Sequence, residues 1–447
     1  EREYVIILRM SERRLTWKAA VKASLWLVRG SIVGICIGLV ISLFVTSIEL
    51  ASHVRSENWW LYLLLPAVAA FTVFVYKKIG KSLDLGTTLA IDAINSMIVT
   101  ALNPSSETDP QIAQLQHRVP LRLAPVVFGA SVLSHVVGAS AGKEGAGVQI
   151  GTSIAGGLSR LERHLVALAT KNKTVLKRGL YNDRDLGMWL ICGSGAAFGA
   201  LFNAPVAGTL FGTQVASPRI NRLEAMAPCL TASYIACWIA NLLKTGYHRF
   251  PLVDTVALDV STVAKVLIAA MCFGLLSRLF CIASKACKKI VSKFRSPIVG
   301  AASAAAVLAI LTLVEWKLLG TTAFNGLGYQ LIDTAYLGSV AWWIPLIKLS
   351  FTAITLAAAL KGGEVVPLLV CGATLGSAMS GLLGLPPSLL ASYGAVATLA
   401  GATKLPVVCF MLGIEFFGAT NPALLFLACT VGYLTSGNLG IYQKQLL

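Results

Sequence analysis

Long apolar runs, separated by short polar and basic segments, dominate this chain of 447 residues. Eight runs are long enough to cross all or most of a bilayer as helices, at 25–50, 59–76, 121–137, 186–202, 225–243, 263–283, 297–314 and 340–360. Shorter apolar pieces broken by glycine and proline lie between them, at 86–101, 145–157, 204–215 and 365–383. A mixture of whole and broken apolar helices is typical of transporters and channels. The pattern therefore predicts an all-α membrane protein.

The composition agrees with a membrane protein. Hydrophobic residues make up 56% of the chain against 13% charged residues, and the mean hydropathy is +0.74. These values lie outside the range of soluble domains. The chain opens with polar and basic sequence, and its first apolar run is too long and too late for a cleavable signal peptide, so we expect none.

The net charge of +17 could indicate a nucleic-acid partner. The positive residues, however, gather in clusters between the apolar runs, at 9–22, 77–81, 160–184 and 285–295. Such clusters are what the positive-inside rule produces where loops contact the anionic cytoplasmic face of a membrane. We therefore expect a cytoplasmic N-terminus and no nucleic-acid partner.

Cysteine and histidine give little sign of a special site. The ten cysteines are scattered, mostly inside apolar runs, and none forms a CxxC pair. We expect no disulfide and no metal site, because a buried free cysteine behaves as a small apolar residue. His135 is the only histidine beside the glycine-rich segment described next, and we expect it to be packed and hydrogen-bonded rather than functional.

The segment Gly142-Lys143-Glu144-Gly145 interrupts apolar sequence on both sides. An ionisable side chain within lipid costs about 3 kcal/mol, so Glu144 needs a compensating role, usually in an ion or proton path. A helix that begins near Glu144 would direct free N–H groups at whatever lies before it. The segment is not a phosphate-binding P-loop, because Val137 replaces the first glycine and Glu144 the magnesium-binding hydroxyl.

Two parts of the chain repeat each other. Residues 204–214 match 405–415, with proline, valine and glycine coinciding at an offset of 201. A second match pairs the glycine-rich segments around Glu144 and Glu364 at an offset of 220. Matching broken segments predict two halves, divided near residue 250, with a binding site at their interface near the bilayer midplane.

Four motifs in the same order resemble those of the CLC family of anion channels and anion/proton antiporters. They are Gly-Lys-Glu-Gly at 142–145, Gly-Glu-Val-Val-Pro at 363–367, Asn-Ala-Pro-Val-Ala-Gly at 203–208, and Tyr442 within 440–442. The first is similar to the family's gating-glutamate motif, with Lys143 in place of arginine and Ala146 in place of proline. The second is similar to its GxFxP segment, and Tyr442 matches the tyrosine that closes the anion path from the inside in that family.

The resemblance covers nearly the whole chain and implies the CLC fold. We expect a single transmembrane domain over 1–447, with about 17 membrane helices in two inverted-topology halves, 25–250 and 251–438, and a terminal helix over 439–447. It also implies a homodimer with one pore per subunit. The small-residue surfaces 204–215 and 405–417 are the expected dimer faces. We expect no cytoplasmic regulatory (CBS) domain, since the chain stops five residues after Tyr442.

The detail is most similar to the fluoride-exporting CLC-F branch. Residues 86–92 resemble that branch's first anion-binding motif, Glu364 directly follows paired glycines as in the branch, and 436–443 looks alike. The chain departs from the branch at Val366, where threonine is usual, and at Lys404, where asparagine is usual. Gln214-Val215 replaces the glutamate pair of chloride antiporters, as expected of a CLC-F-like protein.

The resemblance implies an anion site built from helix starts and hydroxyl groups. Helix N-termini donate N–H groups and partial positive charge without burying a full cation, which suits sites that must also release the ion. The expected anion-binding residues are Gly86, Thr87, Thr88, Gly145, Ala146, Val365, Val366 and Tyr442. Ionised Glu144 would occupy the outer anion site, and protonated Glu144 would swing away and admit an anion.

The remaining charged residues receive different roles. The resemblance implies that Glu364 is the second proton station, with a hydrogen bond to Lys361 or to backbone as the alternative. Lys143 and Lys404 would raise the local potential, or else form salt bridges or reach the protein edge. Asp92 and Glu415 are expected to cap or brace helix ends.

By resemblance, the chain is a multi-pass transporter that exports fluoride in exchange for protons across a bacterial inner membrane, surrounded by lipid and without a cofactor. A passive fluoride or chloride channel gated by Glu144, and a chloride/proton exchanger, remain open alternatives. A membrane enzyme has little support, because the sequence shows no nucleophile–base pair and no metal cluster.

Overall fold

The computed structural model describes residues 2–79, 87–102, 119–169, 183–217, 223–251, 253–418, 421–442 and 445. These residues form sixteen α-helices and one 3₁₀ helix, and no β-strand occurs among them. The helices are α1 (Arg2–Glu57), η1 (Trp59–Leu64), α2 (Leu65–Ile79), α3 (Thr87–Leu102), α5 (Leu123–Val136), α6 (Glu144–Ala169), α8 (Asp183–Phe202), α9 (Pro205–Gln214), α10 (Leu223–Leu242), α11 (Val260–Val291), α12 (Pro297–Leu319), α13 (Tyr329–Leu337), α14 (Ile344–Ala357), α15 (Val365–Leu383), α16 (Pro387–Thr403), α17 (Pro406–Phe417) and α18 (Pro422–Thr435). The all-α prediction is confirmed.

Whole and broken membrane helices alternate along the chain. Seven stretches of helix are long and apolar enough to cross a bilayer, at 20–57, 59–78, 185–202, 223–242, 260–291, 297–319 and 365–383. Four shorter apolar helices, α5, α14, α17 and α18, accompany them. The chain is therefore a multi-pass integral membrane protein, as the apolar runs predicted.

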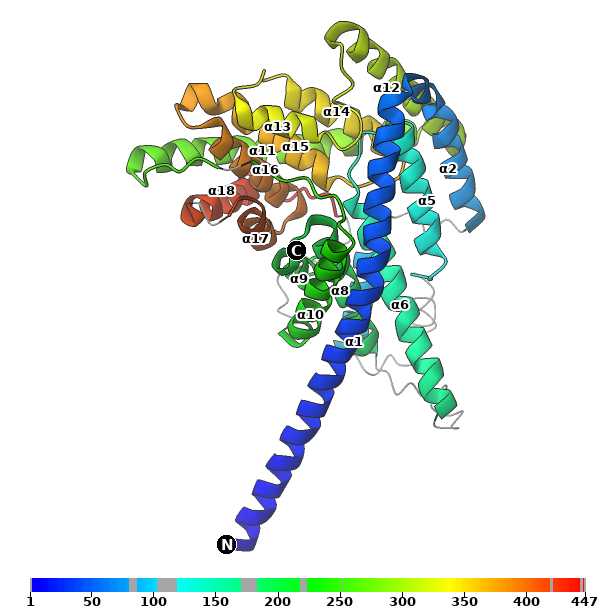
Figure 1. Cartoon of the computed structure of the whole chain (residues 1–447), viewed down its shortest axis with the longest axis vertical. Coiled ribbons are helices and arrows are strands. Elements are labelled where there is room, and N and C mark those ends of the chain that lie inside the picture. Colours follow the sequence, from blue (N-terminus) through cyan, green and yellow to red (C-terminus); the bar gives the residue numbers. More distant parts are fainter. Residues whose placement is uncertain are drawn as a thin grey trace.

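Helix α1 extends far beyond its apolar run. It begins at Arg2 and projects from the body of the molecule (Figure 1). No glycine or proline precedes Gly30, so nothing in the sequence breaks the helix before the apolar run starts. Figure 1 shows the N-terminal end of α1 and the C-terminal end of α6 at the same end of the molecule. The basic cluster 9–22 and the start of the cluster 160–184 thus lie towards one side.

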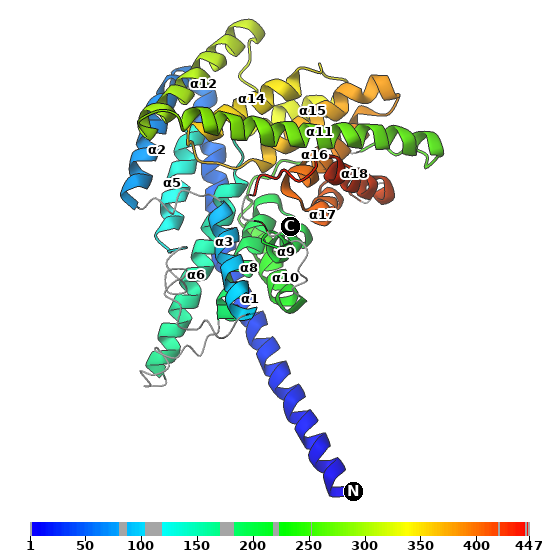
Figure 2. The ribbon, with the colours of Figure 1, turned by 180° about the vertical axis from the view of Figure 1, so that it is seen from behind.

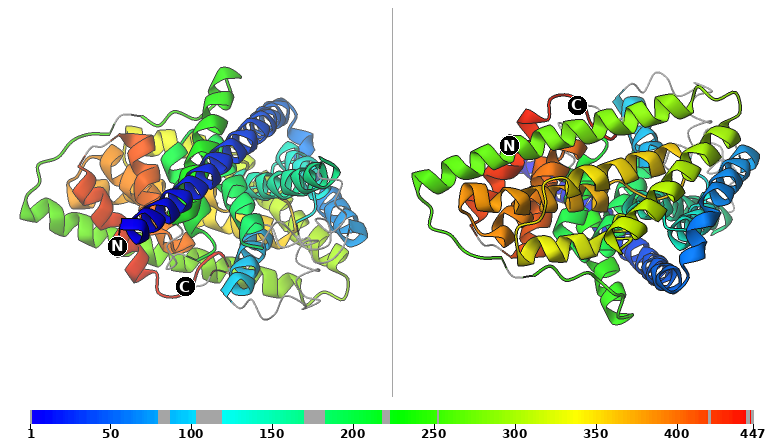
Figure 3. Two further views of the ribbon diagram at one scale, coloured as in Figure 1. Left: turned by 90° about the horizontal axis from the view of Figure 1, so that it is seen from below. Right: turned by 90° about the horizontal axis from the view of Figure 1, so that it is seen from above.

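The two halves occupy different regions of the fold. Helices α1–α10 and α11–α18 are separated along the chain by the segment 243–259, whose described residues 243–251 and 253–259 are non-helical and include the predicted division at residue 250 (Figure 2). Each half begins with a long helix, α1 or α11, which Figure 3 shows as extended rods. The rod of each half packs on a late helix of the same half, α1 on α10 and α11 on α18.

The backbone repeats at the predicted offset of 201. Helix α8 ends at Phe202 and α9 begins at Pro205, while α16 ends at Thr403 and α17 begins at Pro406. Asn203 and Lys404, at the same position in each break, both have left-handed backbone with φ of 55° and 62°. A left-handed residue followed by proline stops one helix and starts the next in a new direction. The first sequence match therefore reflects a structural repeat.

The glycine-rich segments repeat at an offset of 221. Gly138 and Ala359, both after the end of a helix, have positive φ of 87° and 57°. The following helices, α6 and α15, begin at Glu144 and Val365. Each of these pairs is separated by 221 residues.

Two hydrogen bonds cross between the halves in the same register. The N–H of Ser140 donates to Oγ1 of Thr355 at 3.1 Å, and the N–H of Lys361 donates to Oγ of Ser134 at 2.9 Å. An offset of 221 exchanges Ser134 with Thr355 and Ser140 with Lys361, so each bond is the counterpart of the other. Reciprocal bonds of this kind are what a two-fold relation between the segments requires.

The predicted offset of 220 for these segments is therefore wrong by one residue. Glu144 is the first residue of α6 and its structural counterpart is Val365, whereas Glu364 precedes α15 and corresponds to Lys143. The sequence match aligned two glutamates, but the hydrogen-bonded backbone decides the register. The two acids hence approach the interface from non-equivalent positions.

The predicted terminal helix over 439–447 is not formed in residues 439–442, which are non-helical. The N–H of Ile441 instead donates to the carbonyl of Ala402 at 2.9 Å, so this segment is tied to the end of α16. The predicted positions 443, 444, 446 and 447 lie outside the described residues. A pair of glycines, Gly437 and Gly440, explains why the helix of α18 does not continue.

Candidate functional site

Two glycines join the halves at the centre of the interface. Gly142 donates its N–H to the carbonyl of Gly363 at 2.7 Å, and Gly363 returns the bond at 2.6 Å. The two backbones approach too closely for side chains, because a Cβ on Gly363 would lie 2.6 Å from the N of Gly145. Glycine at these positions therefore allows the starts of α6 and α15 to meet.

Three helix N-termini converge beside this bridge. Helix α6 begins at Glu144, α15 at Val365 and α3 at Thr87. The hydroxyl of Thr87 donates to the carbonyl of Gly145 at 3.4 Å, which ties the start of α3 to that of α6. Free N–H groups at helix N-termini carry partial positive charge, so three of them in one place favour an anion.

The Glu144 carboxylate occupies this place. Only 1% of Glu144 is exposed, and its Oε2 accepts the N–H of Val366, in the first turn of α15, at 3.4 Å. Its Oε1 is buried and accepts no hydrogen bond within the described part of the chain. A carboxylate thus stands at the N-terminus of the opposite half's helix, where a mobile anion would otherwise find its donors.

A narrow internal space adjoins Glu144 and is too tight for a water molecule in this conformation. Its lining combines carboxylates, hydroxyls, helix starts and aromatic rings. The lining residues are Thr87, Glu144, Gly145, Val148, Phe198, Phe211, Glu364, Val365 and Tyr442. We call it the central site.

Most of the residues expected to bind the anion or the proton meet in the central site. Thr87, Gly145, Val365, Tyr442 and both glutamates line it. Thr88, Ala146 and Val366 do not line it, although the backbone N–H of Val366 reaches Glu144. Gly86 lies outside the described residues. The structure thus gathers the residues without testing their roles.

Two aromatic residues of the central site carried no sequence signal. Phe198 of α8 and Phe211 of α9 stack with ring centroids 4.2 Å apart and planes 13° apart. Each sits in an apolar run like any core phenylalanine, so its position beside an ion site could not be inferred from the sequence. Both rings line the central site.

Glu364 lies directly before α15. Its side chain does not cap that helix, and it is half-buried at the central site. The alternative partner, Lys361, has its ammonium 4.2 Å from the centroid of the Tyr76 ring. Glu364 therefore lines the same space as Tyr442, and Glu144 lines it from the other half of the molecule.

Lys404 does not line the central site but holds the segment that carries Tyr442. The ammonium of Lys404 donates to Oγ of Ser436 at 2.7 Å and to the carbonyl of Gly437 at 2.5 Å, at the end of α18. Lys404 is 2% exposed, so it does not reach the protein edge. Its contacts position residues 439–442 and, with them, the tyrosine.

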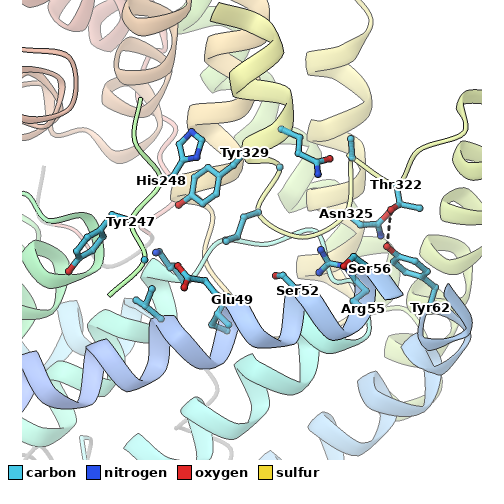
Figure 4. A pocket seen from close by; sticks show the side chains of 18 residues that line it. Glu49, Ser52, Arg55, Ser56, Tyr62, Tyr247, His248, Thr322, Asn325 and Tyr329 are labelled. Atoms are coloured by element: carbon cyan, nitrogen blue, oxygen red, sulfur yellow. Dashed lines mark hydrogen bonds between the residues drawn. The ribbon is translucent and has the colours of Figure 1, made fainter. Parts of the chain in front are cut away.

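Lys143, the neighbour of Glu144 in the chain, faces a different space. It is 3% exposed and lines a polar cavity of about 450 Å³ at the C-terminal end of α1. Figure 4 shows the side chains that surround this cavity, which we call the polar cavity. Its titratable or charged lining residues are Glu49, Arg55, Tyr62, Lys143, Tyr247, His248 and Tyr329.

The residues expected to have structural roles are placed accordingly. Both oxygens of Glu415 accept N–H groups at the start of α9, from Val206 and Ala207 at 2.8 Å each, so Glu415 braces a helix end as predicted. Asp92 is half-buried and lies inside α3, not at either of its ends. His135 is fully buried, and its Nδ1 lies 2.8 Å from the carbonyl of Ser131, which confirms a packed, hydrogen-bonded histidine.

The ten cysteines are free thiols. No group of three or more histidine, cysteine, aspartate or glutamate side chains comes together to hold a metal ion in the described ranges.

Comparisons with known proteins agree with the geometry. The family model described as voltage gated chloride channel matches residues 94–437. A protein of Pseudomonas syringae pv. tomato named chloride/fluoride channel protein is 32% identical over 424 residues, which cover 94% of this chain and 86% of that protein.

Solved structures show the same fold. The crystal structure of a CLC-type fluoride/proton antiporter matches with a TM-score of 0.81 at 25% identity, covering 94% of this chain and 98% of that one. A slow cyanobacterial Cl⁻/H⁺ antiporter matches with a TM-score of 0.70 at 16% identity, covering 92% of this chain and 94% of that one. The second likeness concerns the fold alone.

Proposed function

We propose that this chain, which belongs to the voltage-gated chloride channel (CLC) family and is therefore an anion transporter, exchanges fluoride for protons and exports fluoride from the cytoplasm. Members of this family are transporters or channels rather than enzymes. The proposal concerns the ion that is carried, its coupling to protons and the direction of transport.

Two carboxylates at one closed site carry the proposal. Glu144 and Glu364 line the central site from different halves of the molecule, together with the hydroxyls of Thr87 and Tyr442. A passive pore needs one gating group, and a second acid in lipid would cost free energy without benefit. Two acids on one space can instead pass a proton while an anion moves the other way.

The donor set suits a small, strongly hydrated anion such as fluoride. Backbone N–H groups at the starts of α6 and α15 can replace part of its hydration shell, and the hydroxyl of Thr87 can join them when it turns away from the carbonyl of Gly145. The names of two relatives support the same ion, since one is a fluoride/proton antiporter and the other a chloride/fluoride channel protein.

Competition between Glu144 and the anion couples the two movements. When ionised, the Glu144 carboxylate accepts the N–H of Val366 and excludes an anion from the start of α15. When protonated, it loses the charge that holds it there and gives way to the anion. Glu364 then receives or delivers the proton on the other side of the central site.

The proposal that fluoride is exported requires a defined orientation of the chain in the membrane. We place the N-terminus in the cytoplasm because basic residues cluster there and in the segment that begins on α6. The first membrane span then ends outside, so the polar cavity at its C-terminal end opens outward. The family resemblance implies that the Tyr442 segment faces inward. The membrane would be a bacterial inner membrane.

We further propose a homodimer with one pore per subunit. The predicted faces on α9 and α17 contact each other, and neighbouring helices present large apolar side chains to the surroundings. These exposed residues on α10, α17 and α18 are Leu230, Tyr234, Trp238, Val407 and Phe426. Crosslinking that traps dimers in detergent and in lipid tests the assembly; recovery of monomers alone contradicts it.

Purified protein in liposomes tests the function. An inward fluoride gradient should drive proton movement against a proton gradient, and a chloride gradient of the same size should drive much less. Fluoride flux that leaves the proton gradient untouched would instead support a passive channel, the function that the word channel in the Pseudomonas relative's name favours. Equal coupling to both ions would support a chloride/proton exchanger.

A further inference from the structure

Lys143 lies at the boundary between two internal spaces, the central site and the polar cavity. Its neighbour Glu144 lines the central site, whereas Lys143 itself lines the polar cavity. With 3% of its surface exposed, the ammonium is withdrawn from water. A buried ammonium costs several kcal/mol unless a carboxylate accompanies it.

Two carboxylates lie near Lys143: Glu144 is its neighbour in the chain, and Glu49 lines the same polar cavity without a direct salt bridge to Lys143 in the described structure. Figure 4 shows Glu49 projecting from α1 into this cavity. Gly246 also lines this cavity and lies close to Glu49, because a Cβ on Gly246 would be 2.5 Å from Oε2 of Glu49. The backbone at Gly246 therefore packs directly against the Glu49 carboxylate and limits where it can move.

The other charged and titratable groups around the polar cavity do not replace Glu49. Among the described residues that line it, Glu49 is the only acid. The Nη1 of Arg55 donates to the carbonyl of His135 at 2.9 Å, and the hydroxyl of Tyr62 donates to Thr322 at 2.9 Å.

The remaining titratable groups of the cavity come from the segment 243–259 and from α13. Burial lowers the pKa of His248 from its ordinary value, although Asp333, 3.2 Å away, opposes the shift. Its ring stacks on Tyr329 with centroids 4.3 Å apart. Burial raises the pKa of Tyr247, so this phenol stays neutral.

We propose that Glu49 is a positioning residue whose negative charge, across the polar cavity, balances the charge of Lys143 while Glu144 is protonated, and so sets the pH range in which the gate opens. The inference rests on the proposed role of Glu144. When Glu144 takes up a proton, Lys143 loses one of the two negative charges near it, and the charge of Glu49 remains. Without Glu49, protonation would leave the buried ammonium with no carboxylate, so the ionised, closed gate would persist to lower pH.

Fluoride efflux from liposomes, measured as a function of pH on the side of the polar cavity, tests the proposal. Glu49→Gln should shift the midpoint of the profile to lower pH by about one unit, a typical effect of a nearby charge. Glu49→Asp keeps the charge and should stay close to the parent profile. Ser52→Ala, one turn along the same wall, is the matched neutral control and should not shift it.

Double variants show whether the effect passes through Lys143 and the gate. In a Glu144→Gln background no titrating gate remains, so adding Glu49→Gln should cause no further shift. In a Lys143→Met background there is no ammonium to pair, and Glu49→Gln should again be silent. An unshifted Glu49→Gln profile, an equal shift in Glu49→Asp, or a shift that persists without Glu144 would each overturn the proposal.

The readout separates this inference from the proposed function. The pH profile follows anion flux alone, so it reports on Glu49 even if the protein proves to be a passive channel. Failure of fluoride to drive protons would remove the antiport proposal and leave the Glu49 profile interpretable.

Discussion

Glu144 and Val366 are joined across the two halves, since the N–H of Val366 in the first turn of α15 donates to Oε2 of Glu144, the first residue of α6, at 3.4 Å. A side chain from one half thus fills the N-terminus of a helix from the other. Helix N-termini bind carboxylates and inorganic anions through the same N–H groups. One structural relationship therefore explains how a single carboxyl group could both close an anion path and sense protons.

The first prediction concerns the charge of Glu144. Glu144→Gln keeps the volume of the side chain but cannot ionise, so proton movement should stop and any remaining fluoride flux should become independent of pH. Proton uptake and fluoride efflux from the same liposomes measure both quantities. Glu162→Gln is a control on the same helix, because Glu162 pairs with Arg29 at 2.9 Å and does not line the central site. Proton-coupled transport at the parent rate in Glu144→Gln would refute the gate.

The second prediction concerns Glu364. Glu364→Gln should abolish proton movement without unfolding the protein, because its side chain does not cap α15 and the amide keeps the volume. Proton flux and thermal unfolding, measured together, separate loss of coupling from loss of structure. Intact proton coupling in this variant would favour the passive channel.

Glu415→Gln is the matched control for that experiment. Both oxygens of Glu415 accept backbone N–H groups of α9, and an amide keeps only one acceptor. The variant should therefore lower the free energy of unfolding by about 1–3 kcal/mol while proton coupling persists. The opposite pattern, lost coupling at unchanged stability, would place Glu415 in the proton path and not in the scaffold.

The sequence predicted those parts of the fold and site that leave a mark on residue type. Apolar runs predicted the membrane helices, and a carboxylate among glycines within apolar sequence singled out Glu144, which the structure places at the interface of the two halves; its functional role stays a prediction. The helix break at residue 203 was also visible, because Pro205 and Gly212, which follow it, recur as Pro406 and Gly413. Each signal is strong because lipid tolerates few charges and helices tolerate few prolines.

What the sequence could not provide depends on packing and backbone register. The offset of 221 follows from positive φ at Gly138 and Ala359 and from reciprocal hydrogen bonds, which no match of side chains reveals. Phe198 borders the central site only because α8 and α9 pack there. Glu49, one acid in a long helix, gains its neighbour Lys143 through tertiary structure.

The third prediction tests the close approach of the two halves. A Cβ on Gly142 would collide with Oε2 of Glu144 and lie 3.2 Å from the carbonyl of Gly363. Gly142→Ala should therefore displace the Glu144 carboxylate from the start of α15 and make fluoride flux less dependent on pH. Flux profiles from pH 5 to 8 in liposomes, about the range in which a perturbed carboxyl group titrates, measure this effect.

Gly129→Ala is the control for the glycine variant. Gly129 lies in α5, and a Cβ there meets nothing within 4 Å. Alanine in a helix interior is favoured over glycine by about 1 kcal/mol, so this variant should be neutral or slightly more stable with a parent-like pH profile. If Gly142→Ala behaves in the same way as Gly129→Ala, the carboxylate does not depend on the space that Gly142 leaves.

The last prediction separates two roles for Lys404, a brace for the end of α18 or a source of positive potential at the central site. If Lys404 is a brace, its ammonium stabilises the end of α18 through hydrogen bonds to Ser436 and Gly437. Its backbone is left-handed, with φ of 62°, a conformation that asparagine also adopts. Lys404→Asn should therefore leave the break between α16 and α17 intact but lower the free energy of unfolding by about 1–3 kcal/mol.

Salt dependence decides between the two roles. A lysine that attracts the anion over a distance acts through a field that salt screens, so its removal should weaken fluoride binding mainly at low ionic strength. A brace that holds residues 439–442 should instead weaken binding equally at low and high ionic strength, because the Tyr442 segment loses its place. Since Lys404 does not line the central site, we expect the second outcome. A loss of affinity confined to low salt, with unchanged unfolding, would assign Lys404 an electrostatic role.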